Sequence, residues 1–89
     1  MQIKISKRFV KDTQSIKDKR ILNKIQQVLL QAQTVNDLAT LDNLEEISGC
    51  PNYYRIKFDY RYRIGIFYDG EATEFLRVGS REDFYKRFP

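Results

Sequence analysis

Apolar and polar residues alternate through three segments of the chain between residues 53 and 78. Period-two alternation predicts β-strands with one buried face, because successive side chains of a strand point to opposite sides. The expected strands cover residues 53–59, 61–68 and 73–78. The Asp69-Gly70 pair between the last two favours a tight turn, so these two strands are predicted to form an antiparallel hairpin.

The first third of the chain has a helical pattern between about residues 9 and 34. Phe9 and Ile16 can share one face of a first helix, and residues 17–20, KDKR, mark a turn. The second helix carries a continuous apolar stripe: Ile21, Leu22, Ile25, Val28, Leu29 and Ala32. Such a stripe predicts packing against a sheet.

Two further segments complete the expected fold. Residues 1–6, MQIKIS, alternate and predict a short strand, whereas residues 35–49 place leucine and isoleucine three apart, which fits either helical turns or an extended crossing under the sheet. At 89 residues the chain is long enough for one modest core. We therefore predict a single α+β domain, residues 1–89, in which a helical hairpin packs on one face of an antiparallel sheet that includes the N-terminal strand.

The outward face of the predicted sheet is mainly cationic. Residues expected to face the helices are Tyr54, Ile56, Phe58, Tyr62, Ile64, Ile66, Leu76 and Val78. Residues expected to face outward are Arg55, Lys57, Asp59, Arg61, Arg63, Gly65, Phe75 and Arg77, with Arg81 just beyond the last strand. Like charges on neighbouring strands destabilise a sheet by roughly 0.2–1 kcal/mol per pair, a cost that a bound phosphate chain would reverse. The alternative is a solvated face in which Asp59 and Glu74 act as counter-charges.

Aromatic residues near these cations raise the question of base stacking. Tyr53, Tyr60 and Phe75 are candidates, since aromatic platforms bind unpaired bases. For each of them, ordinary packing within the sheet is the favoured interpretation.

Several functional classes lack the residues that they need. The sequence has no His and a single Cys, Cys50, so we expect no metal site and no Ser-His or Cys-His nucleophile pair. Four isolated glycines provide neither a P-loop nor a dinucleotide fingerprint, so we expect no nucleotide cofactor. No apolar run approaches the roughly 20 residues of a membrane span, and the N-terminus does not resemble a signal peptide. A cytoplasmic location is the expectation.

Charge is unevenly distributed along the chain. Residues 1–30 carry eight Lys or Arg against two Asp, residues 31–50 carry four acids and no base, and the net charge is +4. A basic helical segment commonly faces a polyanion such as nucleic acid, although a solvated lysine-rich helix has the same composition. Charge alone leaves both interpretations open.

The runs SGCPNYYRIKF, YRIGIFYD and FLRVGSREDFYKRF resemble the RelE/ParE superfamily of toxin–antitoxin toxins. In that superfamily a YxIKxx strand, a YRhxh strand (h is apolar) and a VGxRxxxxY-like ending recur in this order. The RelE branch cleaves messenger RNA on the ribosome without a metal, and the ParE branch poisons DNA gyrase. The resemblance implies a toxin whose partners are an antitoxin, the ribosome and messenger RNA. The alternatives are a gyrase inhibitor and a catalytically silent member, and the oligomeric state stays open.

The resemblance also implies roles for particular side chains. Lys57 matches the residue assigned as the base and Arg55 its cationic companion, while Arg63 matches the strand arginine that holds the phosphate. Arg81 matches the arginine after the VG pair, expected to stabilise the leaving oxygen, and Tyr85 the aromatic residue that orients the substrate.

Two other outward cations, Arg61 and Arg77, are expected to contact RNA.

Overall fold

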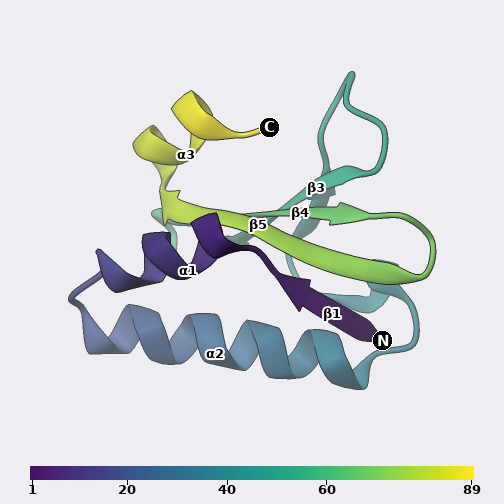
Figure 1. Ribbon diagram of the computed structural model, residues 1–89, viewed down its shortest axis with the longest axis horizontal. Coiled ribbons are helices and arrows are strands. Elements are labelled where there is room, and N and C mark those ends of the chain that lie inside the picture. Colours follow the sequence, from purple (N-terminus) through teal and green to yellow (C-terminus); the bar gives the residue numbers. More distant parts are fainter.

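The computed structural model describes residues 1–89, in which five strands form one sheet in the order β1-β5-β4-β3-β2 (Figure 1). The strands are β1 (Gln2–Ile5), β2 (Leu44–Glu46), β3 (Tyr53–Phe58), β4 (Tyr62–Tyr68) and β5 (Ala72–Ser80). β1 runs parallel to β5, and every other neighbouring pair is antiparallel. The predicted α+β fold class, with an N-terminal strand in the sheet, is confirmed, but the sheet is mixed and not wholly antiparallel because β1 joins it in parallel.

Two helices, α1 (Lys7–Gln14) and α2 (Lys19–Thr34), cover one face of this sheet (Figure 1). Each begins at a side-chain cap that satisfies a free backbone N–H: Ser6 accepts from the amide of Phe9, and Asp18 accepts from the amide of Arg20. The apolar stripe of α2 buries Ile21 and Ile25 against the sheet, as its spacing predicts. None of the helices has the length and apolar character that a membrane crossing needs.

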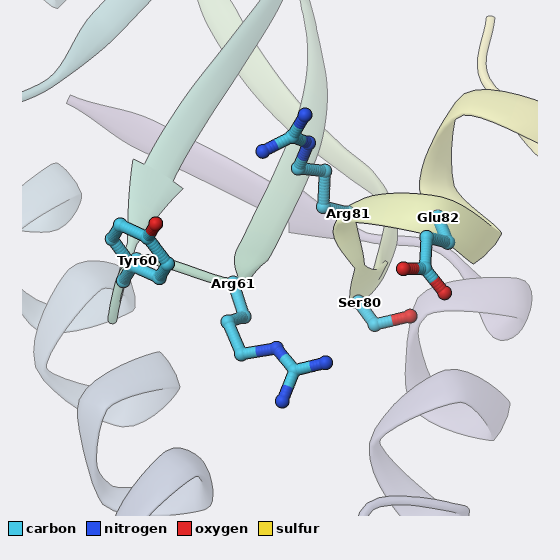
Figure 2. A pocket seen from close by; sticks show the side chains of 5 residues that line it. All are labelled: Tyr60, Arg61, Ser80, Arg81 and Glu82. Carbon is cyan, nitrogen blue, oxygen red and sulfur yellow. The ribbon is translucent and has the colours of Figure 1, made fainter.

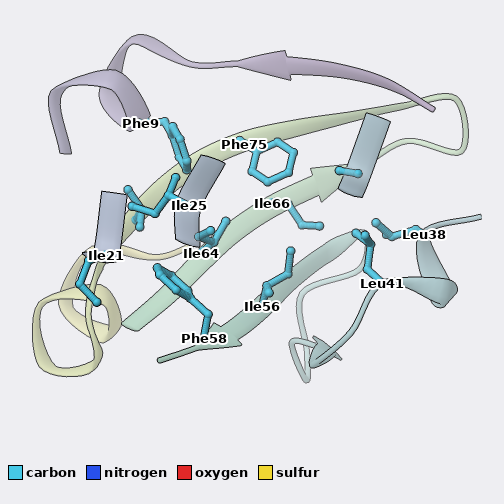
Figure 3. Packing of buried hydrophobic residues seen from close by; sticks show 12 residues of the cluster. Phe9, Ile21, Ile25, Leu38, Leu41, Ile56, Phe58, Ile64, Ile66 and Phe75 are labelled. Carbon is cyan, nitrogen blue, oxygen red and sulfur yellow. The ribbon is translucent and has the colours of Figure 1, made fainter. Parts of the chain in front are cut away.

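The core between the helices and the sheet contains twelve buried apolar residues (Figure 3). They are Phe9, Ile21, Ile25, Ala32, Leu38, Leu41, Ile56, Phe58, Ile64, Ile66, Phe75 and Val78. The inward-facing residues of β3 and β4 are thus mostly those that the alternation predicts.

The side-chain directions predicted for the middle of β5 were wrong. A bulge places Ile66 opposite Phe75 and Gly65 opposite Arg77, which leaves Leu76 as an extra residue. A bulge of this kind resets the alternation of the strand that contains it. Phe75 is therefore fully buried and meets the ring of Phe9 edge-on, with ring centroids 5.7 Å apart.

A third helix, α3 (Arg81–Arg87), covers part of the sheet face that the sequence pattern left open (Figure 1). Ser80 caps it, and the ring of Phe88, just after the helix, packs on Gly65 of β4. A Cβ on Gly65 would lie 2.7 Å from that ring, so this close approach requires glycine.

The spacing in residues 35–49 fitted either helical turns or an extended crossing under the sheet, and the structure contains some of each. These residues form one short 3₁₀ turn, Leu38–Thr40, followed by the edge strand β2, with Leu38 and Leu41 tucked into the core.

Candidate functional site

A pocket of about 310 Å³ lies where the β3–β4 hairpin meets the start of α3. We call it the cationic pocket; its lining residues are Asn43, Lys57, Phe58, Asp59, Tyr60, Arg63 and Arg81. Three cations from β3, β4 and α3 thus share one concave surface. Lys57 and Arg63 are direct cross-strand neighbours in the β3–β4 ladder. Such like-charged pairs destabilise a sheet, and a bound anion would relieve the repulsion.

Arg63 is the most unusual member of the cationic pocket, because it is 6% exposed and forms no ion pair. Its Nη1 donates to the carbonyl oxygens of Tyr60, at 3.2 Å, and of Tyr62, at 2.9 Å. Its Nε is buried and has no hydrogen-bond partner. A buried charge without a counter-charge is costly. Arg63 therefore contributes to the lining of the pocket a fixed positive charge that has no counter-ion.

Lys57 and Arg55 instead share an internal counter-charge, Glu45 of the edge strand β2. The carboxylate of Glu45 lies 2.7 Å from Nζ of Lys57 and accepts from Nη2 and Nε of Arg55 at 2.7 and 3.0 Å. The hydrogen bond from Lys57 and then that from Arg55 lower the pKa of Glu45 below its usual value. Glu45 thus occupies, as a carboxylate, a place beside two of the predicted catalytic cations.

The tip of the β3–β4 hairpin is fastened to α2. Asp59 lies 2.6 Å from Nζ of Lys24 and 3.5 Å from the guanidinium of Arg20, and the hydrogen bond from Lys24 is the main reason why its pKa is lowered. Asp59 is the only acid in the cationic pocket, and these two helix cations offset its charge. Tyr60 follows it with φ of 62° and an exposed fraction of 88%.

A second pocket, also of about 310 Å³, borders the first. Figure 2 shows the side chains that line it. It is lined by Tyr60, Arg61, Ser80, Arg81 and Glu82, so Tyr60 and Arg81 belong to both pockets. The backbone amide of Arg81 donates to the carbonyl of Arg61 at 2.6 Å, which ties the start of α3 to the hairpin. The side chains of Arg61 and Arg81 extend in opposite directions from this tie (Figure 2).

Tyr85 lies on α3, lines neither pocket and packs beside Arg55. The guanidinium of Arg55 sits 5.5 Å from the centroid of the Tyr85 ring, and 49% of Tyr85 is exposed. The same arginine thus contacts both Glu45 and Tyr85. Of the five predicted catalytic residues, Lys57, Arg63 and Arg81 share the cationic pocket, and Arg55 and Tyr85 form a pair next to it.

Arg77, predicted as an RNA contact, lies elsewhere. Its guanidinium donates two hydrogen bonds, of 2.9 and 3.0 Å, to the buried carboxylate of Asp12 on α1. The structure therefore gives Arg77 a role in tying α1 to the sheet. Arg61, the other predicted RNA contact, is exposed and lines the second pocket.

Three side chains of the site were not predicted from the sequence, or were predicted only in part. Glu45 lies on a strand of only three residues, too short to give an alternation signal. Asn43 lines the cationic pocket and has φ of 61°, a conformation that asparagine adopts more readily than most residues. The third is Asp59, interpreted only as a counter-charge. No group of three or more His, Cys, Asp or Glu side chains lies together.

Comparison with known proteins supplies the family. No family model matches the chain. It is 36% identical to toxin RelE3 of Methanocaldococcus jannaschii over the full length of both chains. The crystal structure of the RelB–RelE antitoxin–toxin complex from Methanococcus jannaschii is 34% identical, with a TM-score of 0.82 over 97% of this chain and 99% of that one.

A more distant neighbour shares the fold alone. The crystal structure of YafQ from Escherichia coli is 19% identical, with a TM-score of 0.71 over 92% of this chain and 94% of that one. The full-length identity to RelE3 therefore carries the assignment: this chain belongs to the RelE family of toxins.

Proposed function

We propose that this RelE-type toxin cleaves messenger RNA on the ribosome without a metal ion, and so inhibits translation. The observation that carries the proposal is Arg63, a buried guanidinium without a counter-ion that faces an open pocket beside Lys57 and Arg81. A phosphodiester group would satisfy this charge, because the guanidinium fork matches two phosphate oxygens.

The chemistry requires three things of such a site. The ribose 2′-oxygen must be aligned with the adjacent phosphorus, negative charge on the non-bridging oxygens must be stabilised, and protons must move at the attacking and leaving oxygens. The O2′–P bond then forms while the P–O5′ bond breaks, which yields a 2′,3′-cyclic phosphate and a free 5′-hydroxyl. No metal is needed in principle when cations surround the phosphate.

We assign the roles as the family resemblance implies. Lys57, as the neutral amine, takes the proton of the 2′-hydroxyl, and Arg63 binds the non-bridging oxygens. Arg81 stabilises the leaving 5′-oxygen, which takes a proton from water. Arg55 supports Lys57 from the same face of β3, and Tyr85, which packs against Arg55, orients a neighbouring nucleotide. Their placement around and beside one pocket supports this assignment.

The partners follow from the same surface. An exposed cationic site needs to be masked in the cell, and one similar protein of known structure is an antitoxin–toxin complex. We therefore propose a cognate antitoxin with an acidic or amphipathic segment, and a cytoplasmic site of action. A pull-down from the native host at low salt should recover a small protein partner, and recovery of the toxin alone would count against this.

Mapping of RNA ends after induced expression tests the proposed activity. We expect growth arrest, loss of translation and new messenger RNA ends within translated regions, while DNA supercoiling is unaffected. Double-strand DNA breaks and an SOS response without those RNA ends would select the gyrase-inhibitor alternative. Growth that continues at the uninduced rate would select a catalytically silent member.

Glu45→Gln should tighten the binding of single-stranded RNA. The Glu45 carboxylate competes with a phosphate for Lys57 and Arg55, and its removal leaves both cations free for the ligand. We expect a lower Kd for an uncleavable 2′-O-methyl RNA and a steeper dependence of log K on log salt, because more counterions are released. Fluorescence anisotropy at several salt concentrations measures both.

Glu46→Gln is the matched control. It removes the same charge from an exposed neighbouring residue that forms no ion pair with Lys57 or Arg55. An equal decrease in Kd for the two substitutions would mean that only net charge matters and that Glu45 does not compete with RNA for Lys57 and Arg55.

A further inference from the structure

Tyr60 is the most exposed large hydrophobic side chain of the protein, at 88%. The interpretation that it packs within the sheet was therefore wrong, whereas Tyr53 does pack, against Phe67 and Phe88, and Phe75 lies in the core. The three-residue turn Asp59–Arg61 carries Tyr60 beyond the end of the β3–β4 ladder. Water, rather than protein, surrounds most of its ring.

The backbone at Tyr60 is held in a conformation that a bulky residue rarely adopts. Its φ is 62°, and the amide of Arg61 donates to the carbonyl of Asp59, which closes a γ-turn around it. A tyrosine in this region is strained, and such strain persists only where the surroundings impose it. Glycine would be the favoured residue here on stability grounds.

Three contacts impose this conformation. Lys24 and Arg20 hold the preceding Asp59 from α2, and the buried guanidinium of Arg63 donates to the carbonyl oxygen of Tyr60. The proposed phosphate-binding arginine and the exposed ring are thus linked by one hydrogen bond. Because these contacts fix the backbone of the hairpin tip, binding needs to order only the side-chain torsions of Tyr60.

The ring lies between two places suited to phosphate. It borders the cationic pocket with Lys57 and Arg63 on one side, and the second pocket with Arg61 on the other; Arg81 lines both. Glu82 also lines the second pocket and offsets part of its charge, so the cationic pocket is the stronger anion site. Successive phosphates of a single strand flank each base, and bases stack on exposed aromatic rings.

We infer that Tyr60 is a stacking platform for the base of the nucleotide that joins the scissile phosphate in the cationic pocket to the next phosphate in the second pocket. The inference rests on the proposed function, since it takes RNA as the ligand. It makes Tyr60 a binding residue distinct from Tyr85, which lies beside Arg55 on α3. Stacking tolerates any base, so Tyr60 adds affinity and positioning without strict sequence selection.

Tyr60→Gly and Tyr60→Phe separate stacking from a structural role. Glycine relieves the positive φ and deletes the ring, so we expect an equal or higher Tm together with binding of an uncleavable 2′-O-methyl RNA hexamer that is weaker by about 5- to 100-fold. Phenylalanine keeps the ring and should bind like wild type. Asn52→Gly is the matched control, because Asn52 also has positive φ, 71°, but lines neither pocket. It should leave both Tm and affinity close to the wild-type values.

Single-turnover cleavage of ribosome-bound messenger RNA, with the full chain, provides the second measurement. If the wild-type protein cleaves but Tyr60→Gly binds and cleaves equally well, the stacking inference is wrong and the proposed function stands. If the wild-type protein binds the hexamer through Tyr60 but leaves ribosome-bound RNA intact, the proposed activity is wrong and the platform stands. A wild-type protein that neither binds nor cleaves RNA overturns both.

Discussion

Arg63→Ala should lower the single-turnover rate of messenger RNA cleavage about 10²- to 10³-fold, the usual effect of removing one preorganised charge contact from a reacting group. The large effect is expected because Arg63 reaches the pocket already desolvated and already fixed by two carbonyl oxygens. Nothing in the protein neutralises it, so its full charge is available to the phosphate. The rate is measured on ribosomes programmed with a defined messenger RNA, with toxin in excess.

Arg63→Lys separates charge from geometry at this position. Lysine keeps the positive charge but loses the planar fork, so a bidentate role predicts a substantial loss of rate in this variant too. Arg8→Ala, which removes an exposed cation of α1 outside both pockets, is the control for net charge and should cleave at the wild-type rate.

Folding must be compared before the rates are interpreted, because Arg63 also holds the hairpin tip through the carbonyl of Tyr60. If wild type and Arg63→Lys have the same Tm, a lower cleavage rate of the variant reflects a change in the site and not a loss of folded protein. A folded Arg63→Ala protein that cleaves at the wild-type rate would mean that the cationic pocket is not the active site.

The sequence pattern predicted the strands of residues 53–78 and the helical hairpin because each has a periodicity long enough to recognise. It failed within β5, where one bulge at Leu76 inverts the alternation and buries Phe75. It also missed α3, a helix of seven residues with Phe84 as its only buried residue. Both features depend on tertiary contacts that local patterns do not encode.

In the site, too, the sequence predicted some residues, whereas others depend on tertiary contacts. Outward alternation and the family resemblance selected Lys57, Arg63 and Arg81, and these three do share a pocket. Neither could place Glu45 beside Lys57, since that contact depends on the pairing of β2 with β3. Alternation likewise put Arg77 among the outward cations, whereas its partner Asp12 lies 65 positions away in sequence and is invisible to a local pattern.

Asp12→Ala should destabilise the protein by about 3–5 kcal/mol, the range for removing one partner of a buried ion pair. Asp12 is 8% exposed and accepts hydrogen bonds from the guanidinium of Arg77 and, at 3.0 Å, from the backbone amide of Val78. β1 ends at Ile5, opposite Phe75, so no strand is available to pair with that amide. The carboxylate thus takes the place of the missing strand at this edge of β5.

Urea denaturation measures the loss of stability, with an unchanged m-value expected if the native and unfolded states keep their exposed areas. Asp12→Asn should fall between wild type and Asp12→Ala, because the amide retains one acceptor oxygen but not the charge. Glu71→Ala, at an exposed position in the β4–β5 turn, is the control for loss of a carboxylate and should change stability little. Equal stability of Asp12→Ala and Glu71→Ala would show that Arg77 and Val78 find other partners. In that case the edge of β5 would not depend on Asp12.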